Sequence, residues 1–157
     1  MKVHEIMHEF PVCCTQWDTA LEAARTMKEN DVGVLPVVAK NGAGRLVGIV
    51  TDRDLCLAVV SKSDSPIRVN VASCMTTPPI SCRLDDDVSF AMSLMRQHHV
   101  RRVPVVDSEG SIAGMLSITN LVNNVDPNEL LKTLKAVFRP SPRNMLAHTG
   151  HGIGHPA

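Results

Sequence analysis

An internal repeat constrains the fold of this chain more than any other feature of its sequence. A shift of 68 residues aligns two long stretches, which end in the Pro-Val-Val segments at 36–38 and 104–106. The aligned pairs include Met7 and Met75, Pro11 and Pro79, Cys14 and Cys82, Asp18 and Asp86, and Met27 and Met95. After residue 38 the shift becomes 66 residues, because the first copy has two additional residues in its turn at 40–44. The sequence therefore predicts one supersecondary unit that occurs twice.

Hydrophobic spacing predicts a helix early in each copy. Apolar residues recur at 20, 23, 24 and 27, and again at 88, 91, 92 and 95, which is the spacing of a helix that buries one face. Thr19 and Glu22 have the form of a capping box before the first of these helices. Asp87 stands at the matching position before the second. We therefore expect the two helices to begin at equivalent positions.

Two strands are predicted to follow each of these helices. They lie at 34–38, 46–50, 102–106 and 112–116. Each second strand leads directly into another helix, and a short strand is predicted after Pro11 and after Pro79, so each copy has the order β-α-β-β-α. Pro36 and Pro104 lie early in the first strand of each pair, and we expect them to place these strands at a sheet edge. The fold class is α/β (α+β), with two repeats packed about a pseudo-twofold axis.

Beyond the second copy the sequence predicts one more helix and a tail. Asp126 can cap this helix and Pro127 suits its first position. We divide the chain into a first repeat at 1–61, a linker at 62–69, a second repeat at 70–125, a C-terminal helix at 126–139 and a flexible tail at 140–157. The tail contains His148, His151 and His155. Imidazoles at such spacing can meet one metal ion, but the glycines of the tail favour a segment that binds no metal.

Composition excludes several classes of partner. The chain has 16 basic and 16 acidic residues and 3% aromatic residues, so nothing in it favours nucleic acid or an anionic membrane. Five cysteines without a C-x-x-C motif indicate reduced thiols and not a disulfide framework or a zinc site. No window approaches the roughly 20 apolar residues that cross a bilayer. We expect a cytoplasmic protein.

The segment at 48–55, Gly-Ile-Val-Thr-Asp-Arg-Asp-Leu, is the richest local signal. A buried strand turns here into a helix, with Thr51 and Asp54 at the turn. Thr51 and Asp54 can simply cap the helix by satisfying its free N–H groups. The alternative is a ligand site, in which a phosphate rests on the start of the helix and Asp54 accepts hydrogen bonds from a ribose. Spacing alone leaves both interpretations open.

The same segment, together with the repeat and the Pro-Val-Val strand, resembles the cystathionine-β-synthase (CBS) domain pair over residues 1–125. The resemblance implies an adenosyl ligand, with Thr51 on the phosphate and Asp54 on the ribose. We expect Asp52, which lies between them in the motif, to belong to the nucleotide-binding site as well. In the second copy Ser117 keeps the hydroxyl, whereas Asn120 replaces the expected aspartate. An amide lacks the charge that strengthens such a hydrogen bond, so we expect the Asp54 site to be the stronger.

Arg101 is the candidate phosphate-binding residue. It belongs to a basic cluster, His98-His99-Val100-Arg101-Arg102, at the end of the helix in the second copy, where cations favour the helix dipole without any ligand. In CBS pairs a basic residue three positions before the strand proline often reaches a phosphate. Arg101 has this position relative to Pro104, and we expect it to act from the neighbouring copy or a partner chain.

The resemblance implies a regulatory module and not an enzyme. We expect AMP, ATP, S-adenosylmethionine or another adenosyl compound to bind between the repeats, with no cofactor required, and an unknown effector protein to respond. A homodimer is also implied. The sequence contains no G-x-S-x-G or Walker motif to support an enzyme. The alternative is a dimerisation scaffold without a ligand, in which Thr51 and Asp54 only cap.

Overall fold

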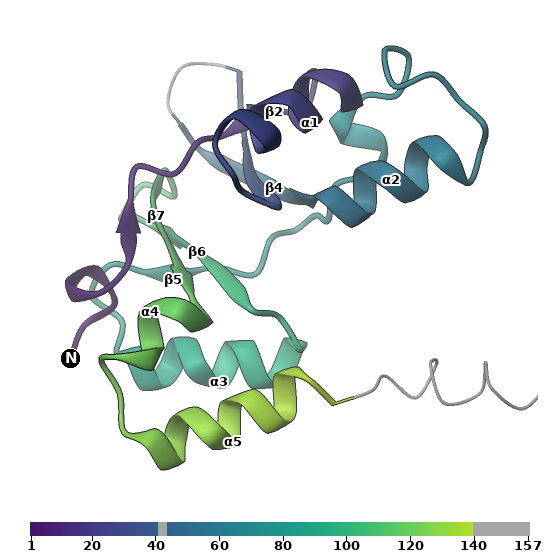
Figure 1. The fold of residues 1–157 in the computed structure, drawn as a ribbon. Coiled ribbons are helices and arrows are strands. Elements are labelled where there is room, and N and C mark those ends of the chain that lie inside the picture. The colour runs from purple at the N-terminus through teal and green to yellow at the C-terminus, as the bar shows by residue number, and fades with distance from the viewer. Residues whose placement is uncertain (41–43, 140–157) are drawn as a thin grey trace, which may run out of the picture.

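The computed structural model describes residues 1–40 and 44–139 of the chain. Two β-sheets lie back to back in the middle, and helices cover their outer sides (Figure 1). In chain order the elements are a 3₁₀ helix (Val3–Glu5), β1 (His8–Glu9), β2 (Cys14–Thr15), α1 (Ala20–Glu29), β3 (Val34–Val38), β4 (Leu46–Thr51), α2 (Asp52–Val60), a second 3₁₀ helix (Val71–Ser73), β5 (Cys82–Arg83), α3 (Val88–His98), β6 (Arg102–Val106), β7 (Ile112–Ser117), α4 (Ile118–Val122) and α5 (Pro127–Val137).

The predicted repeat is confirmed, because β2 to α2 and β5 to α4 have the same order and pairing. In each copy the first strand pairs parallel with the second, and the second pairs antiparallel with the third. The predicted helices begin where the caps indicated. Thr19 and Glu22 form the capping box of α1, with a hydrogen bond of 3.2 Å from the Glu22 N–H to Thr19 Oγ1. Asp87 precedes α3, but its carboxylate binds Lys2 Nζ at 3.0 Å.

The predicted edge position of Pro36 and Pro104 is wrong. β3 lies between β2 and β4, and β6 lies between β5 and β7. The strands on their proline side are only two residues long, and they pair with the two residues that follow each proline. A proline lacks the N–H that a second neighbour needs, so it is tolerated in a central strand whose second neighbour begins after it.

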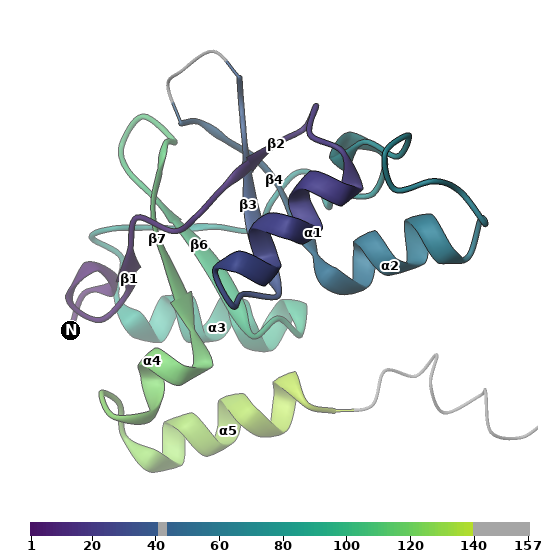
Figure 2. The same cartoon turned by 45° about the horizontal axis from the view of Figure 1, so that its top comes forward.

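The segments that begin the two repeats are exchanged between them. We call residues 1–11 and 69–79 the leading segments. β1, in the first leading segment, pairs with β7 of the second repeat (Figure 2). Thr76, 68 residues after His8, pairs with Ile49 of the first repeat through hydrogen bonds of 2.8 and 3.1 Å. Each leading segment therefore extends the sheet of the other repeat.

The exchange also completes the two hydrophobic cores. Val3 is fully buried in the core of the second repeat, together with residues such as Met95 and Leu116. Val71 is fully buried in the core of the first repeat, with Leu35 among its neighbours. Burial of a valine side chain stabilises a fold by about 1.5–3 kcal/mol. The matching N–H groups of Val3 and Val71 each donate a hydrogen bond of 2.9 Å into the other repeat.

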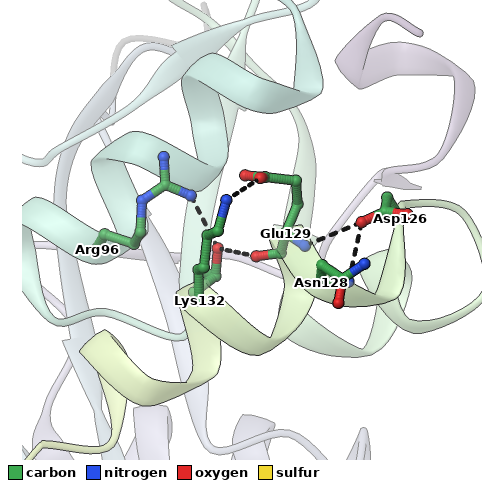
Figure 3. A network of polar contacts seen from close by, with 6 residues as sticks. Arg96, Asp126, Asn128, Glu129 and Lys132 are labelled. Atoms are coloured by element: carbon green, nitrogen blue, oxygen red, sulfur yellow. Dashed lines mark hydrogen bonds and ion pairs between the residues drawn. The ribbon is translucent and has the colours of Figure 1, made fainter.

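Helix α5 covers the second repeat by packing on α3 and α4 (Figure 1). Asp126 Oδ1 accepts hydrogen bonds from the Asn128 and Glu129 N–H groups at 2.9 and 3.2 Å, so the predicted cap is confirmed. Thr133 is fully buried and accepts from Arg96 Nη1 at 2.9 Å, within the network that Figure 3 shows. The first repeat has no such covering helix within the described residues.

Two glycines permit the exchange, and their substitution should disrupt it. A Cβ atom on Gly114 would lie 2.9 Å from the carbonyl oxygen of His8, and one on Gly48 would lie 3.1 Å from that of Thr76. Backbone atoms in paired segments cannot move away cheaply, so we expect Gly114→Val and Gly48→Val each to lower the free energy of unfolding by about 1–3 kcal/mol in chemical denaturation.

Gly110→Asn is the control for these two variants. A Cβ at Gly110 meets no atom within 4 Å, and asparagine tolerates its positive φ of 83° better than most residues do. Wild-type stability in Gly114→Val and Gly48→Val would show that the leading segments are not held against the sheets.

Candidate functional site

Thr51 and Asp54 form a closed hydrogen-bonded pair where β4 becomes α2. The Thr51 hydroxyl and the Thr51 N–H both donate to Asp54 Oδ2, at 2.7 and 2.9 Å. The Asp54 N–H in turn approaches Thr51 Oγ1 at 3.2 Å. We call this the first junction. Both bonds to the carboxylate end on Oδ2, and no hydrogen bond from a described residue reaches Oδ1, so one carboxylate oxygen is open to a further donor.

Ser117 and Asn120 form the equivalent pair, the second junction, where β7 becomes α4. The Ser117 hydroxyl donates to Asn120 Oδ1 at 2.6 Å, and the Ser117 N–H donates to the same atom at 2.9 Å. The side-chain oxygen is therefore fully engaged, and the remaining amide group is a donor and not an acceptor. α4 is also shorter, with five residues against nine in α2. The second junction thus differs from the first in charge and in helix length.

Asp52 does not join the hydrogen bonds between Thr51 and Asp54. Its side chain is exposed, and its Oδ1 accepts from the Arg53 N–H at 2.7 Å. Its own N–H donates to the carbonyl of Gly33 at 3.1 Å, which ties the start of α2 to the start of β3. Two carboxylates, Asp52 and Asp54, therefore stand in the first turn of α2.

Arg101 lies at the second junction. Its carbonyl accepts from the Ile118 N–H at 3.0 Å, which is the equivalent of the bond from Asp52 to Gly33. Its guanidinium carbon is 6.0 Å from the centre of the Phe138 ring, at the end of α5. This distance is at the limit of a cation–π contact, and the side chain is exposed. Arg101 is therefore positioned by α5 and is free to meet an anion from solvent.

A cleft of about 240 Å³ opens at the second junction, between the two repeats. Its lining includes Ser117, Asn120 and Arg102 from the second repeat and Asn30 from the first. The sequence analysis missed Arg102 as a site residue, although it named the basic cluster that contains it. Pairing supplies the missing signal, because Arg102 lies opposite Ser117 in the register of β6 and β7.

The first leading segment supplies part of the wall of this cleft, through His8, Phe10 and Pro11. These residues belong in sequence to the first repeat, and they reach the second junction only because the leading segments are exchanged. No motif in the sequence indicates this contribution.

Cys14 and Cys82, which occupy equivalent positions in the two repeats, are poorly suited to redox chemistry. Burial raises the pKa of the Cys14 thiol to about 12, and burial also raises the pKa of Cys82 to about 12. The thiolate is the reactive form, so neither is a nucleophile near neutral pH.

Residues 1–40 and 44–139 hold no cluster of three or more metal-ligating side chains. His148, His151 and His155 lie outside the described residues. No described helix has the length and apolar character needed to cross a bilayer.

Together these features define a tandem α/β module with a strand-to-helix junction in each repeat. The family model of the CBS domain matches residues 3–61 and 71–126, so the chain belongs to the CBS domain family. The predicted family is therefore confirmed. The chain is 35% identical to the uncharacterized protein YlbB of Bacillus subtilis over 128 aligned residues. The aligned region is 82% of this chain and 84% of YlbB.

Two similar solved structures contain AMP. The CBS domain protein PAE2072 from Pyrobaculum aerophilum, complexed with AMP, is 28% identical with a TM-score of 0.72, over 87% of this chain and 100% of that chain. CBSX2 from Arabidopsis thaliana, in complex with AMP, is 27% identical with a TM-score of 0.67, over 78% of this chain and 93% of that chain.

The hydrogen bonds of the first junction should contribute to stability without any ligand. Thr51→Val removes the hydroxyl that caps α2 while keeping the shape of the side chain. We expect it to lower the free energy of unfolding by about 1 kcal/mol in guanidinium chloride, whereas Thr51→Ser should retain most of the wild-type value. An unchanged midpoint in Thr51→Val would show that the hydroxyl does not cap the helix.

Proposed function

We propose that this chain is a regulatory module that binds an adenosyl ligand between its two repeats. Binding changes the shape of the module, and an effector protein responds to that change. The observation that carries this proposal is the pair formed by Thr51 and Asp54, which leaves Asp54 Oδ1 open to a donor. The AMP complexes of two similar CBS proteins support adenosine as the ligand class. The proposed role is regulatory, and it requires no resident cofactor and no catalytic residue.

Capping and ligand binding are compatible at the first junction. The cap uses only Oδ2 of Asp54, so a ribose hydroxyl can donate to Oδ1 while Thr51 stays in place. At the second junction Asn120 Oδ1 already accepts two hydrogen bonds. An amide also lacks the charge that strengthens a hydrogen bond to a ribose. We therefore propose that Asp54 makes the stronger ribose contact and that Asn120 makes the weaker one.

A phosphate at the first junction needs a cation nearby. The N–H groups of Asp52, Arg53 and Asp54, at the start of α2, already donate to protein oxygens, so they do not by themselves hold a phosphate. Asp52 and Asp54 also place two negative charges in the same turn, and these repel an anion. We propose that Arg101 offsets them, from this chain or from a partner chain. The guanidinium group can form two parallel hydrogen bonds to a phosphate.

A ligand-free scaffold is the second candidate function. The observation that favours it is that the capping hydrogen bonds at both junctions form among protein atoms alone. In that case Thr51 and Ser117 stabilise the helices, and the two repeats serve only to hold a second chain. The scaffold and the sensor differ in one respect that is easily measured, which is binding of adenosyl compounds.

We also propose that the module is a cytoplasmic homodimer that associates through α1 and α2. A groove of about 300 Å³ between these helices is lined mainly by apolar side chains, among them Leu21, Leu55 and Val59. Val60, at its edge, is 68% exposed. On the second repeat α5 covers the equivalent helices, so a helix of a second copy is the natural cover for the first. A symmetric dimer places the same face on both sides of such an interface.

Substitutions at the junctions test the ligand site. We expect Asp54→Asn to weaken binding of adenosine nucleotides by about tenfold or more, because the charge-assisted contact is worth roughly 1.5–3 kcal/mol. Asn120→Ala should weaken binding less. Arg101→Ala should weaken the binding of AMP and ATP but not that of adenosine, since only the phosphorylated ligands offer the guanidinium a partner. Calorimetric titration of each variant measures these effects.

The control is the thermal stability of the same proteins without ligand. If Asp54→Asn binds nucleotide as the parent does, and loses only the stability of a helix cap, then Asp54 only caps α2 and the ligand hypothesis at the first junction fails.

Light scattering tests the proposed dimer. Val60→Asp places a charge in the apolar groove, and we expect it to convert a dimer into a monomer at micromolar concentration. Ile67→Asp is the matched control, because Ile67 is 62% exposed but does not line the groove. A wild-type protein that is monomeric at high micromolar concentration contradicts the proposal.

A further inference from the structure

Phe10 has a conformation and an environment that do not help the free chain to fold. Its φ angle is +49°, in the left-handed region that is disfavoured for a bulky residue. Its side chain is 85% exposed, so the ring gains little from burial. The backbone is nevertheless held in place, because the Phe10 N–H donates to the carbonyl of Ala113 at 3.3 Å. Backbone strain at a fixed and exposed aromatic residue points to a role in binding.

The position of Phe10 indicates what it binds. Phe10 lines the cleft of about 240 Å³ that contains Ser117, Asn120 and Arg102. An aromatic face suits a planar ring, and a guanidinium suits an anion. The cleft therefore contains an aromatic ring and a guanidinium, which suit the base and the phosphate of a nucleotide.

Charge distinguishes this cleft from the first junction. None of the described residues that line it is acidic, and Arg102 contributes a positive charge. The first turn of α2, in contrast, carries Asp52 and Asp54. The residue equivalent to Phe10, 68 positions later, is Pro78, which has no aromatic ring. The pseudo-twofold axis therefore relates two sites of different chemistry.

We propose that the cleft at the second junction is a separate site for the phosphorylated nucleotide, in which the ring of Phe10 stacks on the base and Arg102 binds the phosphate. This inference rests on the proposed function, because it assigns a ligand and its contacts to one of the two sites. Asn120 makes a weak ribose contact here, and Phe10 and Arg102 compensate for it. Phe10 reaches the site only through the exchanged leading segment.

The size of the effect follows from stacking. Removal of an aromatic ring that stacks on a base typically costs about tenfold in affinity, and it does so for any planar base. Loss of the guanidinium affects only ligands that carry a phosphate. The two groups therefore have separable signatures, because Phe10 acts on AMP and adenosine alike, whereas Arg102 acts on AMP alone.

Calorimetry in an Asp54→Asn background isolates the second site, because this substitution weakens the first. We expect Phe10→Ala and Phe10→Leu each to reduce the affinity for both AMP and adenosine by about tenfold. Leucine keeps an apolar side chain but removes the aromatic face. Arg102→Ala should reduce the affinity for AMP and leave that for adenosine unchanged. Trp17→Ala is the matched control, because Trp17 is 59% exposed but does not line the cleft.

Fluorescence reports on contact with the base directly. Trp17 is the only tryptophan of the chain, so a Trp17→Phe, Phe10→Trp protein has a single reporter at the cleft. We expect AMP to quench its emission over the same concentration range as the calorimetric titration.

The outcomes separate the two levels of the proposal. If AMP binds to the Asp54→Asn protein but Phe10→Ala binds it equally well and the reporter emission does not change, stacking by Phe10 is wrong while the sensing function stands. If the wild-type protein binds no adenosyl compound, the proposed function itself fails, and the second site fails with it.

Discussion

Each hydrophobic core of this module is closed by a segment that belongs, in sequence, to the other repeat. Val3 and Val71 make equivalent contacts in opposite cores, and their N–H groups make equivalent hydrogen bonds. Gly48 and Gly114 keep the sheets free of side chains where the leading segments pass. Neither core is complete without the crossing chain, so the two repeats form a single cooperative unit. The contacts of the leading segments also fix the spacing between the two repeats.

This exchange also determines the chemistry of the sites. A leading segment passes the strand-to-helix junction of the opposite repeat, and it brings Phe10 to Ser117 and Asn120. The repeats share a backbone plan, but their junctions differ in charge, with Asp54 in one and Asn120 in the other. Duplication of one unit has therefore produced two related junctions, and in the proposed function they bind one ligand with different affinities. Ligand binding that favours one arrangement of the repeats shifts the population toward it.

Much of this fold was predictable from the sequence, since the repeat, the strands at 34–38 and 102–106, and the junctions at Thr51 and Ser117 are all local patterns. The central position of the strands that contain Pro36 and Pro104 was not predictable, because it depends on neighbours that are only two residues long. The exchange of the leading segments was also not predictable from the sequence. Alignment shows that Val3 and Val71 are equivalent, but it does not show which core receives each side chain. For the same reason the role of the first leading segment in the cleft was not visible.

The central claim is that this module binds an adenosyl ligand, and direct titration of the unmodified protein with AMP, ATP, S-adenosylmethionine and adenosine tests it. We expect at least one of these compounds to bind saturably. At about 100 times its dissociation constant the ligand should also raise the free energy of unfolding by roughly 2.7 kcal/mol. The absence of both heat and thermal stabilisation with all four compounds would contradict the claim, and the hydrogen bonds at Thr51 and Ser117 would then be helix caps alone.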